Sequence, residues 1–216
     1  MRGKYQGVPK HSKKCKKADK NRASDGNDAY HLGTWETTSS EPRITAESKA
    51  PLQNSVQTRK IDNFLYHVKK YALPQIQAVI KRYFPAQWEW RQICTDRARG
   101  RLAQAFQDRP CLDLGDGFHA IAVKKGSSNK LHIDMFDGLM AWLIVLGLWD
   151  EGGYLVIPQL GTKFRIPPRS AFGFLATRLA HFATPPTEGD RVVITCYTDC
   201  FLLNHACEAL GVSAPL

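Results

Sequence analysis

Apolar residues recur with a helical period in the middle of the chain. The spacing i, i+3, i+4, i+7 and i+11, which marks one face of a helix, is followed by Ile61, Phe64, Leu65, Val68 and Ala72. Pro74 suits the first turn of a second helix, and Pro85 either ends that helix or begins a third. Residues 56–112 are therefore predicted to form a helical part.

After Asp113-Leu-Gly-Asp-Gly117 the pattern changes to short apolar runs between turn signals. Eight strands are predicted, at about 118–124, 130–135, 140–146, 153–157, 163–166, 171–175, 179–183 and 190–198. A helix follows from Asp199 to Leu210 and is closed by Gly211. Short strands in this number favour a compact jelly roll. The predicted fold class is α+β: a double-stranded β-helix (jelly roll) over 113–200, with helices before it and a C-terminal helix in 201–216.

The first 55 residues lack any periodic pattern and are rich in polar side chains, so we expect a disordered tail before a single domain over 56–216. The basic cluster at 10–17 is a nuclear localisation signal, a phosphate-binding arm or simply a solvated tail. The 216 residues carry a formal net charge of +10. Such an excess favours polyanionic partners, chiefly nucleic acid, although the tail supplies much of it.

Composition narrows the cellular setting. The N-terminus has no apolar signal segment, and the longest apolar run, 139–149, is too short to span a bilayer. We expect an intracellular protein with reduced thiols, in the nucleus or otherwise the cytoplasm. One group, Cys196, Cys200, His205 and Cys207, suggests zinc, but without paired CxxC spacing buried thiols are the favoured interpretation.

The candidate chemistry centres on His132-Ile-Asp134. Side chains on a strand alternate, so His132 and Asp134 would point to the same face. His181 follows 47 residues after Asp134, and Arg191 lies ten residues beyond it. Two histidines and one carboxylate form the facial triad of non-haem Fe(II) oxygenases, which leaves positions open for a cosubstrate and O2.

Arg191 strengthens this interpretation. Arginine binds a carboxylate through two donors while staying charged, which suits the distal carboxylate of 2-oxoglutarate. Thr195 shares the face of Arg191 by the two-residue period of the last strand, and is a second candidate for cosubstrate binding. A catalytic zinc site also takes three protein ligands, but it does not explain the arginine. An H-x-D pair alone is a weak signal; the four residues together are specific.

Five segments carry a family resemblance: Phe118-His-Ala-Ile-Ala-Val, His132-Ile-Asp134, Gly152-Gly-Tyr-Leu-Val-Ile-Pro-Gln-Leu-Gly161, Arg178-Leu-Ala-His181 and Gly189-Asp-Arg191. Over about 115–200 the chain resembles the TET/JBP family of Fe(II)/2-oxoglutarate dioxygenases, most closely its short fungal forms. The Gly-Gly run narrows the resemblance to this family, because the metal and arginine pattern is common to all 2-oxoglutarate oxygenases.

The resemblance implies iron on His132, Asp134 and His181, and 2-oxoglutarate on Arg191. It implies oxidation of the methyl group of a base in DNA, 5-methylcytosine or N6-methyladenine, as in DNA demethylation. The products would be a hydroxymethyl base, succinate and CO2. A methylated base inside a duplex cannot reach the metal, so the base would be flipped into the site.

Several positions depart from the family pattern. Asp137 stands where animal TET enzymes have an asparagine that holds the flipped base. As an acceptor it would take the amino group of cytosine or adenine, or else it is a solvated turn residue. The turn Pro167-Pro-Arg-Ser170 replaces the usual Pro-Gly-Asp, and the cysteine-rich extension of animal TETs is missing. Phosphate contacts are then expected from Lys124, Lys125 and Lys130, unless these flank a merely solvated turn.

Three alternatives stay open from sequence. Arg97, Arg99 and Arg101 either face nucleic acid or form a solvated helix face. The enzyme either acts on a nucleic acid base or hydroxylates a protein side chain or small molecule. A non-catalytic reader of methylated DNA is the last alternative, and the complete triad with Arg191 argues against it.

Overall fold

The computed structural model describes residues 29–36, 40–49 and 55–215. They group into two compact units, each considered by itself. The strand unit is built around residues 122–195, and the helical unit comprises 31–121 with 196–216. The basic cluster at 10–17 and most of the expected tail lie outside the described residues.

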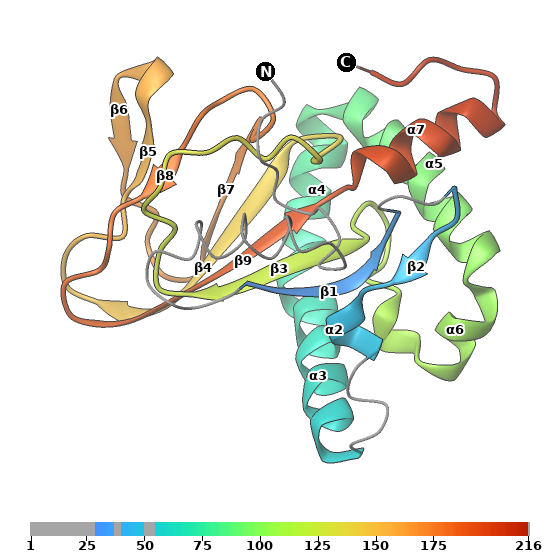
Figure 1. Ribbon diagram of the computed structural model, residues 1–216, viewed down its shortest axis with the longest axis horizontal. Coiled ribbons are helices and arrows are strands. Elements are labelled where there is room, and N and C mark those ends of the chain that lie inside the picture. Colours follow the sequence, from blue (N-terminus) through green and yellow to red (C-terminus); the bar gives the residue numbers. More distant parts are fainter. Residues whose placement is uncertain (1–28, 37–39, 50–54, 216) are drawn as a thin grey trace, which may run out of the picture. The chain divides into compact units, whose positions relative to one another are not determined.

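Two sheets make up the strand unit (Figure 1). Its strands are β3 Ala120–Lys125, β4 Ala141–Trp149, β5 Leu155–Ile157, β6 Thr162–Phe164, β7 Ser170–Phe174, β8 Phe182–Ala183 and β9 Gly189–Tyr197, with a 3-10 turn, η4, at Pro158–Leu160. The larger sheet contains the order β3-β9-β4-β7, and the smaller has the order β6-β5-β8. Strand β4 pairs antiparallel with β7, and β5 pairs antiparallel with both of its neighbours.

Strand β4 supplies much of the core of this unit. Ala141, Leu143 and Val145 alternate along it and belong to one buried apolar cluster with residues of β5 and β7. Trp142 and Ile144, on the opposite face of the strand, are also buried. A strand buried on both faces reads in sequence as a continuous apolar run, which is the pattern that β4 shows.

Seven of the eight expected strands overlap with β3 to β9. The expected strand at 130–135 is wrong: the segment is irregular and holds only an isolated bridge between His132 and His181. The mixture of helices with antiparallel sheet is confirmed. The jelly-roll arrangement of the strands stays a prediction.

The helical unit contains most of the helices. They are α2 Ala46–Lys49, α3 Ser55–His67, the π-helix η2 Val68–Ala72, α4 Leu73–Tyr83, α5 Pro85–Arg101, α6 Ala103–Asp108, the 3-10 helix η3 Pro110–Leu112 and α7 Cys200–Ala209. Helix α5 packs against α4 and α7. Among the described segments, no helix combines the length and apolar character needed to cross a membrane.

Part of the expected disordered tail is ordered. Strands β1 Tyr30–Trp35 and β2 Arg43–Ile44 pair antiparallel, with Thr34 opposite Ile44. Leu32, Thr34 and Glu36 are buried, and the amide of Thr34 donates to the carbonyl oxygen of His119 at 2.6 Å. The prediction of disorder was therefore wrong for this stretch, because its few apolar residues find distant partners.

A π-helix displaces the buried stripe of the first helices. Leu65 and Val68 are buried as predicted, but the next buried residue is Leu73 rather than Ala72. The wider π turn places an additional residue in the turn. From Leu73 the α-helical period resumes through Ile76 and Ile80, which are both buried.

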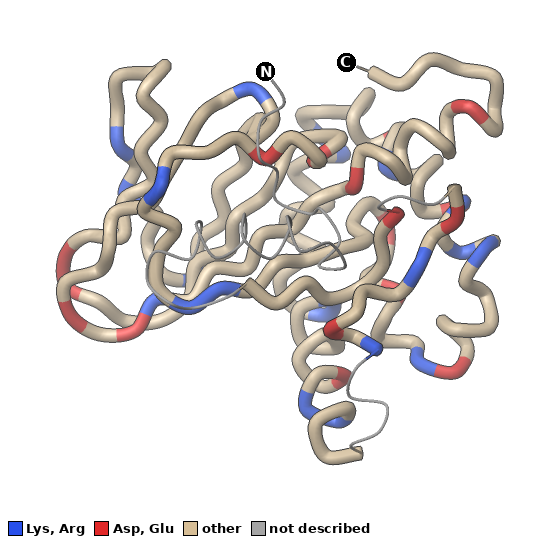
Figure 2. The backbone as a smooth tube through the Cα atoms, viewed as in Figure 1, with Lys and Arg blue, Asp and Glu red and all other residues tan. Residues whose placement is uncertain are grey.

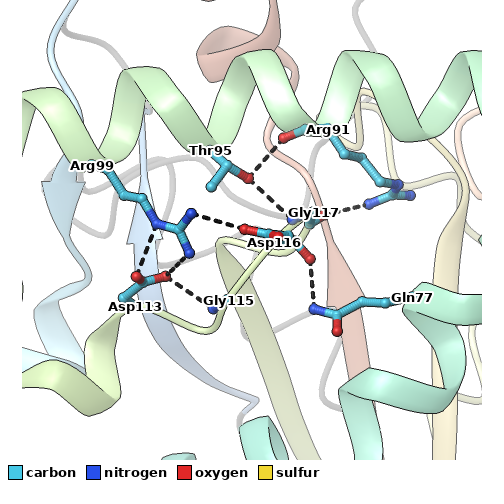
Figure 3. Close-up of polar contacts among 8 residues, drawn as sticks. All are labelled: Gln77, Arg91, Thr95, Arg99, Asp113, Gly115, Asp116 and Gly117. Atoms are coloured by element: carbon cyan, nitrogen blue, oxygen red, sulfur yellow. Dashed lines mark hydrogen bonds and ion pairs between the residues drawn. The ribbon is translucent and has the colours of Figure 1, made fainter. Parts of the chain in front are cut away.

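Helix α5 holds the turn at 113–117, where the sequence changes from helices to strands. Figure 3 shows Arg91, Thr95 and Arg99 pointing from one helix towards this turn. The guanidinium of Arg91 donates to the carbonyl oxygen of Gly117 at 2.9 Å, and the hydroxyl of Thr95 accepts from the Gly117 amide at 3.0 Å. Gly117 has φ +88°, a backbone conformation that disfavours a side chain.

Ion pairs complete the attachment of this turn. Arg99 donates to Asp113 at 2.9 Å and to Asp116 at 2.8 Å, while Gln77 of α4 donates to the Asp116 carbonyl oxygen at 2.6 Å (Figure 3). Burial of the guanidinium of Arg91 among these polar groups is complete. Removing the partners of a buried guanidinium is costly, so the helix and the turn depend on each other.

We expect Arg91→Met to lower the free energy of unfolding by about 2–4 kcal/mol, because the Gly117 carbonyl and the Thr198 hydroxyl would each lose a buried donor. Urea denaturation measures the change. The exposed Arg101→Met is the matched control and should alter stability by less than about 0.5 kcal/mol. Equal effects of the two variants would contradict a specific role of Arg91.

Candidate active site

A backbone bridge brings His132 and His181 together. The amide of His132 donates to the carbonyl oxygen of His181 at 3.0 Å, and the amide of His181 donates back at 2.9 Å. The amide of Asp134 donates to the carbonyl oxygen of Ala176 at 3.0 Å. These bonds fix the backbone of all three residues although no regular strand forms at 130–135.

The three side chains converge on one point. His132 Nε2 lies 3.8 Å from Asp134 Oδ1, and His181 Nε2 lies 3.6 Å from Asp134 Oδ2. The two imidazole centroids are 4.3 Å apart, and one ligand atom from each residue lies within 4.8 Å of the others. Asp134 and His181 are buried, and His132 is partly buried. Within the described part of the chain, this is the one such group of three His, Cys, Asp or Glu.

A hydrogen bond from Nδ1 to a backbone carbonyl oxygen orients each imidazole ring. His132 Nδ1 lies 2.7 Å from the carbonyl oxygen of Lys130, and His181 Nδ1 lies 2.9 Å from that of Leu179. A carbonyl oxygen only accepts, so each Nδ1 must carry the proton. In the neutral ring, Nε2 then offers a lone pair on the side that faces Asp134. Phe174 supports His181 by an edge contact with centroids 4.8 Å apart.

This donor set fits a divalent metal ion. Two imidazole nitrogens and a carboxylate oxygen on one side of an ion match the facial triad that suits Fe(II). A buried carboxylate between two histidines is also costly unless positive charge compensates it. The residues would hold the ion from one side only and leave its other side to exogenous ligands.

Arg191, on β9, is a buried cation without an acidic partner among the described residues. Its Nη1 donates to the carbonyl oxygen of Gly126 at 3.0 Å, while its Nε has no hydrogen-bond partner in that part of the chain. Burial lowers the pKa of Arg191 to about 10. A desolvated guanidinium with an unused donor is suited to a carboxylate ligand.

Trp149 and Gly153 shape the surroundings of Arg191. The guanidinium carbon lies 5.8 Å from the centroid of the Trp149 ring, within the range of cation–π attraction. Gly153 has φ +65°, and a Cβ there would come within 2.9 Å of both Arg191 Cδ and Trp149 Nε1. The sequence analysis treated Gly152-Gly153 only as a family marker and missed that Gly153 and Trp149 lie beside Arg191. A glycine often marks a place where other atoms approach the backbone closely, and this was the available signal.

The other expected binding residues have different surroundings. Thr195 is partly buried and follows Arg191 by four residues on β9, as the two-residue period requires. Asp137 is buried, and its amide donates to the carbonyl oxygen of Asp134 at 3.2 Å. The alternative of a solvated turn side chain at Asp137 is therefore wrong.

The three lysines are not equivalent. Lys125 pairs with Asp190 at 2.6 Å, which reduces its availability to phosphate. Lys124 is partly buried near the end of β3, and Lys130 is exposed. Lys130 also contributes its carbonyl oxygen to His132, so its backbone helps to orient one ring of the candidate site.

Two further groups of residues have structural roles. Arg97 pairs with buried Glu36 at 2.8 Å, and Arg101 lies 3.5 Å from Glu41. Arg97 and Arg99 therefore have structural partners rather than freely solvated side chains, whereas Arg101 is exposed, as on a solvated face. In the group for which buried thiols were favoured over zinc, Cys196 and Cys207 are buried free thiols and His205 pairs with Glu36. Burial raises the pKa of Cys196 to about 12, which favours the inert thiol.

No protein-family model and no curated protein matches the sequence. Among solved structures, the chain is similar to NgTET1 in complex with 5mC DNA: the TM-score is 0.50 and the identity 16%, over 90% of this chain and 70% of that one. A viral collagen prolyl hydroxylase from Paramecium bursaria Chlorella virus-1, in a 2OG complex, covers 48% of this chain with a TM-score of 0.34 and 16% identity, too weak a likeness to carry an argument. The first similarity shows the fold alone: the chain shares its fold with NgTET1.

The geometry predicts that the chain binds a divalent cation at His132, Asp134 and His181. Calorimetric titration of the metal-free protein with Mn(II) or Co(II) should show a single high-affinity site. Replacing a ligand should cost more than the 10–100-fold typical of outer-shell changes, so we expect His181→Ala to weaken binding by about 100-fold or more. The exposed His67→Ala is the control and should bind normally. Undiminished binding in His181→Ala would place the ion elsewhere.

Proposed function

We propose that this chain is an Fe(II)/2-oxoglutarate-dependent dioxygenase of the TET/JBP type, which oxidises the methyl group of a modified base in nucleic acid. The observation that carries the proposal is the convergence of His132, Asp134 and His181 in the unit that also buries Arg191, which has no acidic partner among the described residues. A metal triad alone suits several enzyme classes, whereas the buried arginine adds a place for a dicarboxylate cosubstrate.

The chain's own residues would do three things at the metal. His132 and His181 donate their Nε2 lone pairs, and Asp134 supplies the carboxylate that balances the charge of the ion. The Lys130 and Leu179 carbonyl oxygens keep both rings in the required orientation. When bound, Fe(II) supplies the activation of O2 that couples conversion of 2-oxoglutarate to succinate and CO2 with hydroxylation of the substrate methyl group.

Arg191 would bind the distal carboxylate of 2-oxoglutarate. Its free Nε and a low-dielectric setting strengthen a charge-assisted hydrogen bond, and Trp149 limits the positions that the guanidinium can adopt. Thr195, with its hydroxyl on the same strand face, is the second proposed contact for the cosubstrate.

A nucleic acid substrate is supported by three observations. The fold is similar to that of NgTET1, whose structure contains 5mC DNA. The chain carries a formal net charge of +10. Asp137 is buried three residues after Asp134, where a carboxylate can accept the exocyclic amino group of a flipped cytosine or adenine. Lys124, Lys125 and Lys130 are the proposed phosphate contacts; Lys125 also pairs with Asp190.

The proposal predicts a specific product pattern. Protein supplied with Fe(II), 2-oxoglutarate and O2 should convert oligonucleotides that contain 5-methylcytosine or N6-methyladenine to hydroxymethyl products, detected by mass spectrometry of the nucleosides. His132→Ala and Asp134→Ala should lower turnover by about 1000-fold or more, since each removes an interaction needed for the chemical step. Slow succinate formation without any oxidised base would contradict the nucleic acid substrate and favour a protein or small-molecule one.

Arg191→Met should raise the KM for 2-oxoglutarate by about 100-fold, because loss of a buried charged hydrogen bond costs about 2–3 kcal/mol. Gly153→Ala should have a smaller effect in the same direction, since its Cβ would displace both Arg191 and Trp149. Initial rates at varied cosubstrate concentration measure both changes. An unchanged KM in Arg191→Met would remove Arg191 from the cosubstrate site.

A further inference from the structure

A second surface of the chain, far from the metal-binding residues in sequence, combines cations with exposed aromatic rings. It lies on α3, η2 and α4, over residues 55–83. This stretch contains Arg59, Lys60, Lys69, Lys70, Lys81 and Arg82 but only one acidic residue, Asp62. Asp62 is bound by Arg109 at 2.5 Å, and no Asp or Glu occurs from 63 to 88. Figure 2 shows the basic positions on these helices, which Figure 1 labels α3 and α4.

The centre of this surface is a cluster on the π-helix. The ammonium of Lys70 lies 5.4 Å from the ring centroid of Tyr66 and 5.3 Å from that of Tyr71, and it donates to the Tyr66 hydroxyl at 3.0 Å. His67 packs beside both tyrosines, with centroids 5.4 and 5.7 Å away. Tyr66 is 47% and Tyr71 58% exposed, so their rings are presented to solvent.

The exposed stripe continues along α4. Tyr71, Gln75, Ala78 and Arg82 follow the spacing i, i+4, i+7 and i+11, and all four are exposed. Arg82 lies 5.3 Å from the ring centroid of Tyr83, which is itself 62% exposed. A second pairing of cation and aromatic ring therefore lies near the end of α4.

The helices α3, η2 and α4 pack against the rest of the protein through their opposite face. Leu65, Val68, Leu73, Ile76 and Ile80 are buried, so packing does not require the tyrosines and cations to be where they are. The π-helix is the feature that sets the two faces in register, because its wide turn carries Lys70 and Tyr71 outward while Leu73 turns inward. Single-turn π-helices of this kind are frequent at functional sites.

We propose that this face, named here the tyrosine-lysine face and defined by Tyr66, Lys70, Tyr71, Lys81 and Arg82, binds single-stranded nucleic acid. The cations contact phosphates, and the exposed rings of Tyr66 and Tyr71 stack on unpaired bases, which a duplex keeps inside. The near-absence of acidic residues fits a polyanion, and the interleaved rings distinguish a single strand from a duplex. The binding shares its ligand class with the proposed enzymatic function but requires neither metal nor cosubstrate.

The test is a binding titration of the full chain in EDTA, without iron or 2-oxoglutarate. A short fluorescently labelled single strand of mixed sequence and the corresponding duplex are compared by anisotropy at several salt concentrations. The expected result is tighter binding of the single strand. Because turnover plays no part, a failure here is distinguishable from a failure of the proposed oxygenase activity.

Variants separate base stacking on the tyrosine rings from phosphate contacts of the cations. Tyr66→Leu with Tyr71→Leu should weaken single-strand binding by about fivefold or more for each ring, whereas Tyr66→Phe with Tyr71→Phe should retain it, because the rings remain. Lys81→Gln with Arg82→Gln should lower the salt dependence of log Kd by about 0.7 for each phosphate that the protein no longer neutralises. All five residues of the tyrosine-lysine face are exposed, so circular dichroism should show unchanged folding.

The matched control is Lys163→Gln with Arg165→Gln, which removes the same charge from exposed positions in the strand unit. It should leave affinity nearly unchanged. The proposal is overturned if this control loses as much affinity as the α4 variant, if the leucine variant binds the single strand like the wild type, or if the duplex binds as tightly as the single strand.

Discussion

The candidate site depends on two backbone hydrogen bonds between His132 and His181. They join segments almost fifty residues apart and set the imidazole rings side by side, where a carboxylate two residues from one histidine can reach both. The segment before β4 forms no regular strand, so this bridge and the bond from the Asp134 amide to the Ala176 carbonyl oxygen hold its backbone in the unit. The convergence of the three candidate ligands thus depends on main-chain pairing as well as on side-chain chemistry.

Sequence patterns predicted that His132, Asp134 and His181 lie together, and they predicted much of the fold. The spacing of His132, Asp134, His181 and Arg191 was sufficient to select the residues, because few other chemistries need that combination. The expected cause of their shared orientation was wrong, however: an isolated bridge, rather than a strand, directs His132 and Asp134. The two-residue alternation of side chains correctly predicted that His132 and Asp134 point the same way. It did so because this alternation belongs to extended backbone and does not require a sheet.

Other features depend on interactions that no local pattern encodes. Ala72 and Leu73 are both apolar, so the sequence did not reveal a π turn that buries the second instead of the first. Arg97 looked like a surface charge because its partner, Glu36, lies in a stretch with the composition of a disordered tail. The crowding around Gly153 requires knowledge of where Arg191 and Trp149 meet. Tertiary context decided each of these cases.

The carbonyl groups that orient the two histidines come from the residues two positions before them, Lys130 and Leu179. The tautomer of each ring is consequently encoded in the local main chain, and no outside side chain has to be retained for it. The exposed side chain at 130 can change without disturbing the orientation of the His132 ring, whereas Leu179 also packs against the buried apolar cluster and is constrained by it. At position 130, therefore, charge and shape can diverge beside the candidate site while the main chain keeps the His132 ring in place.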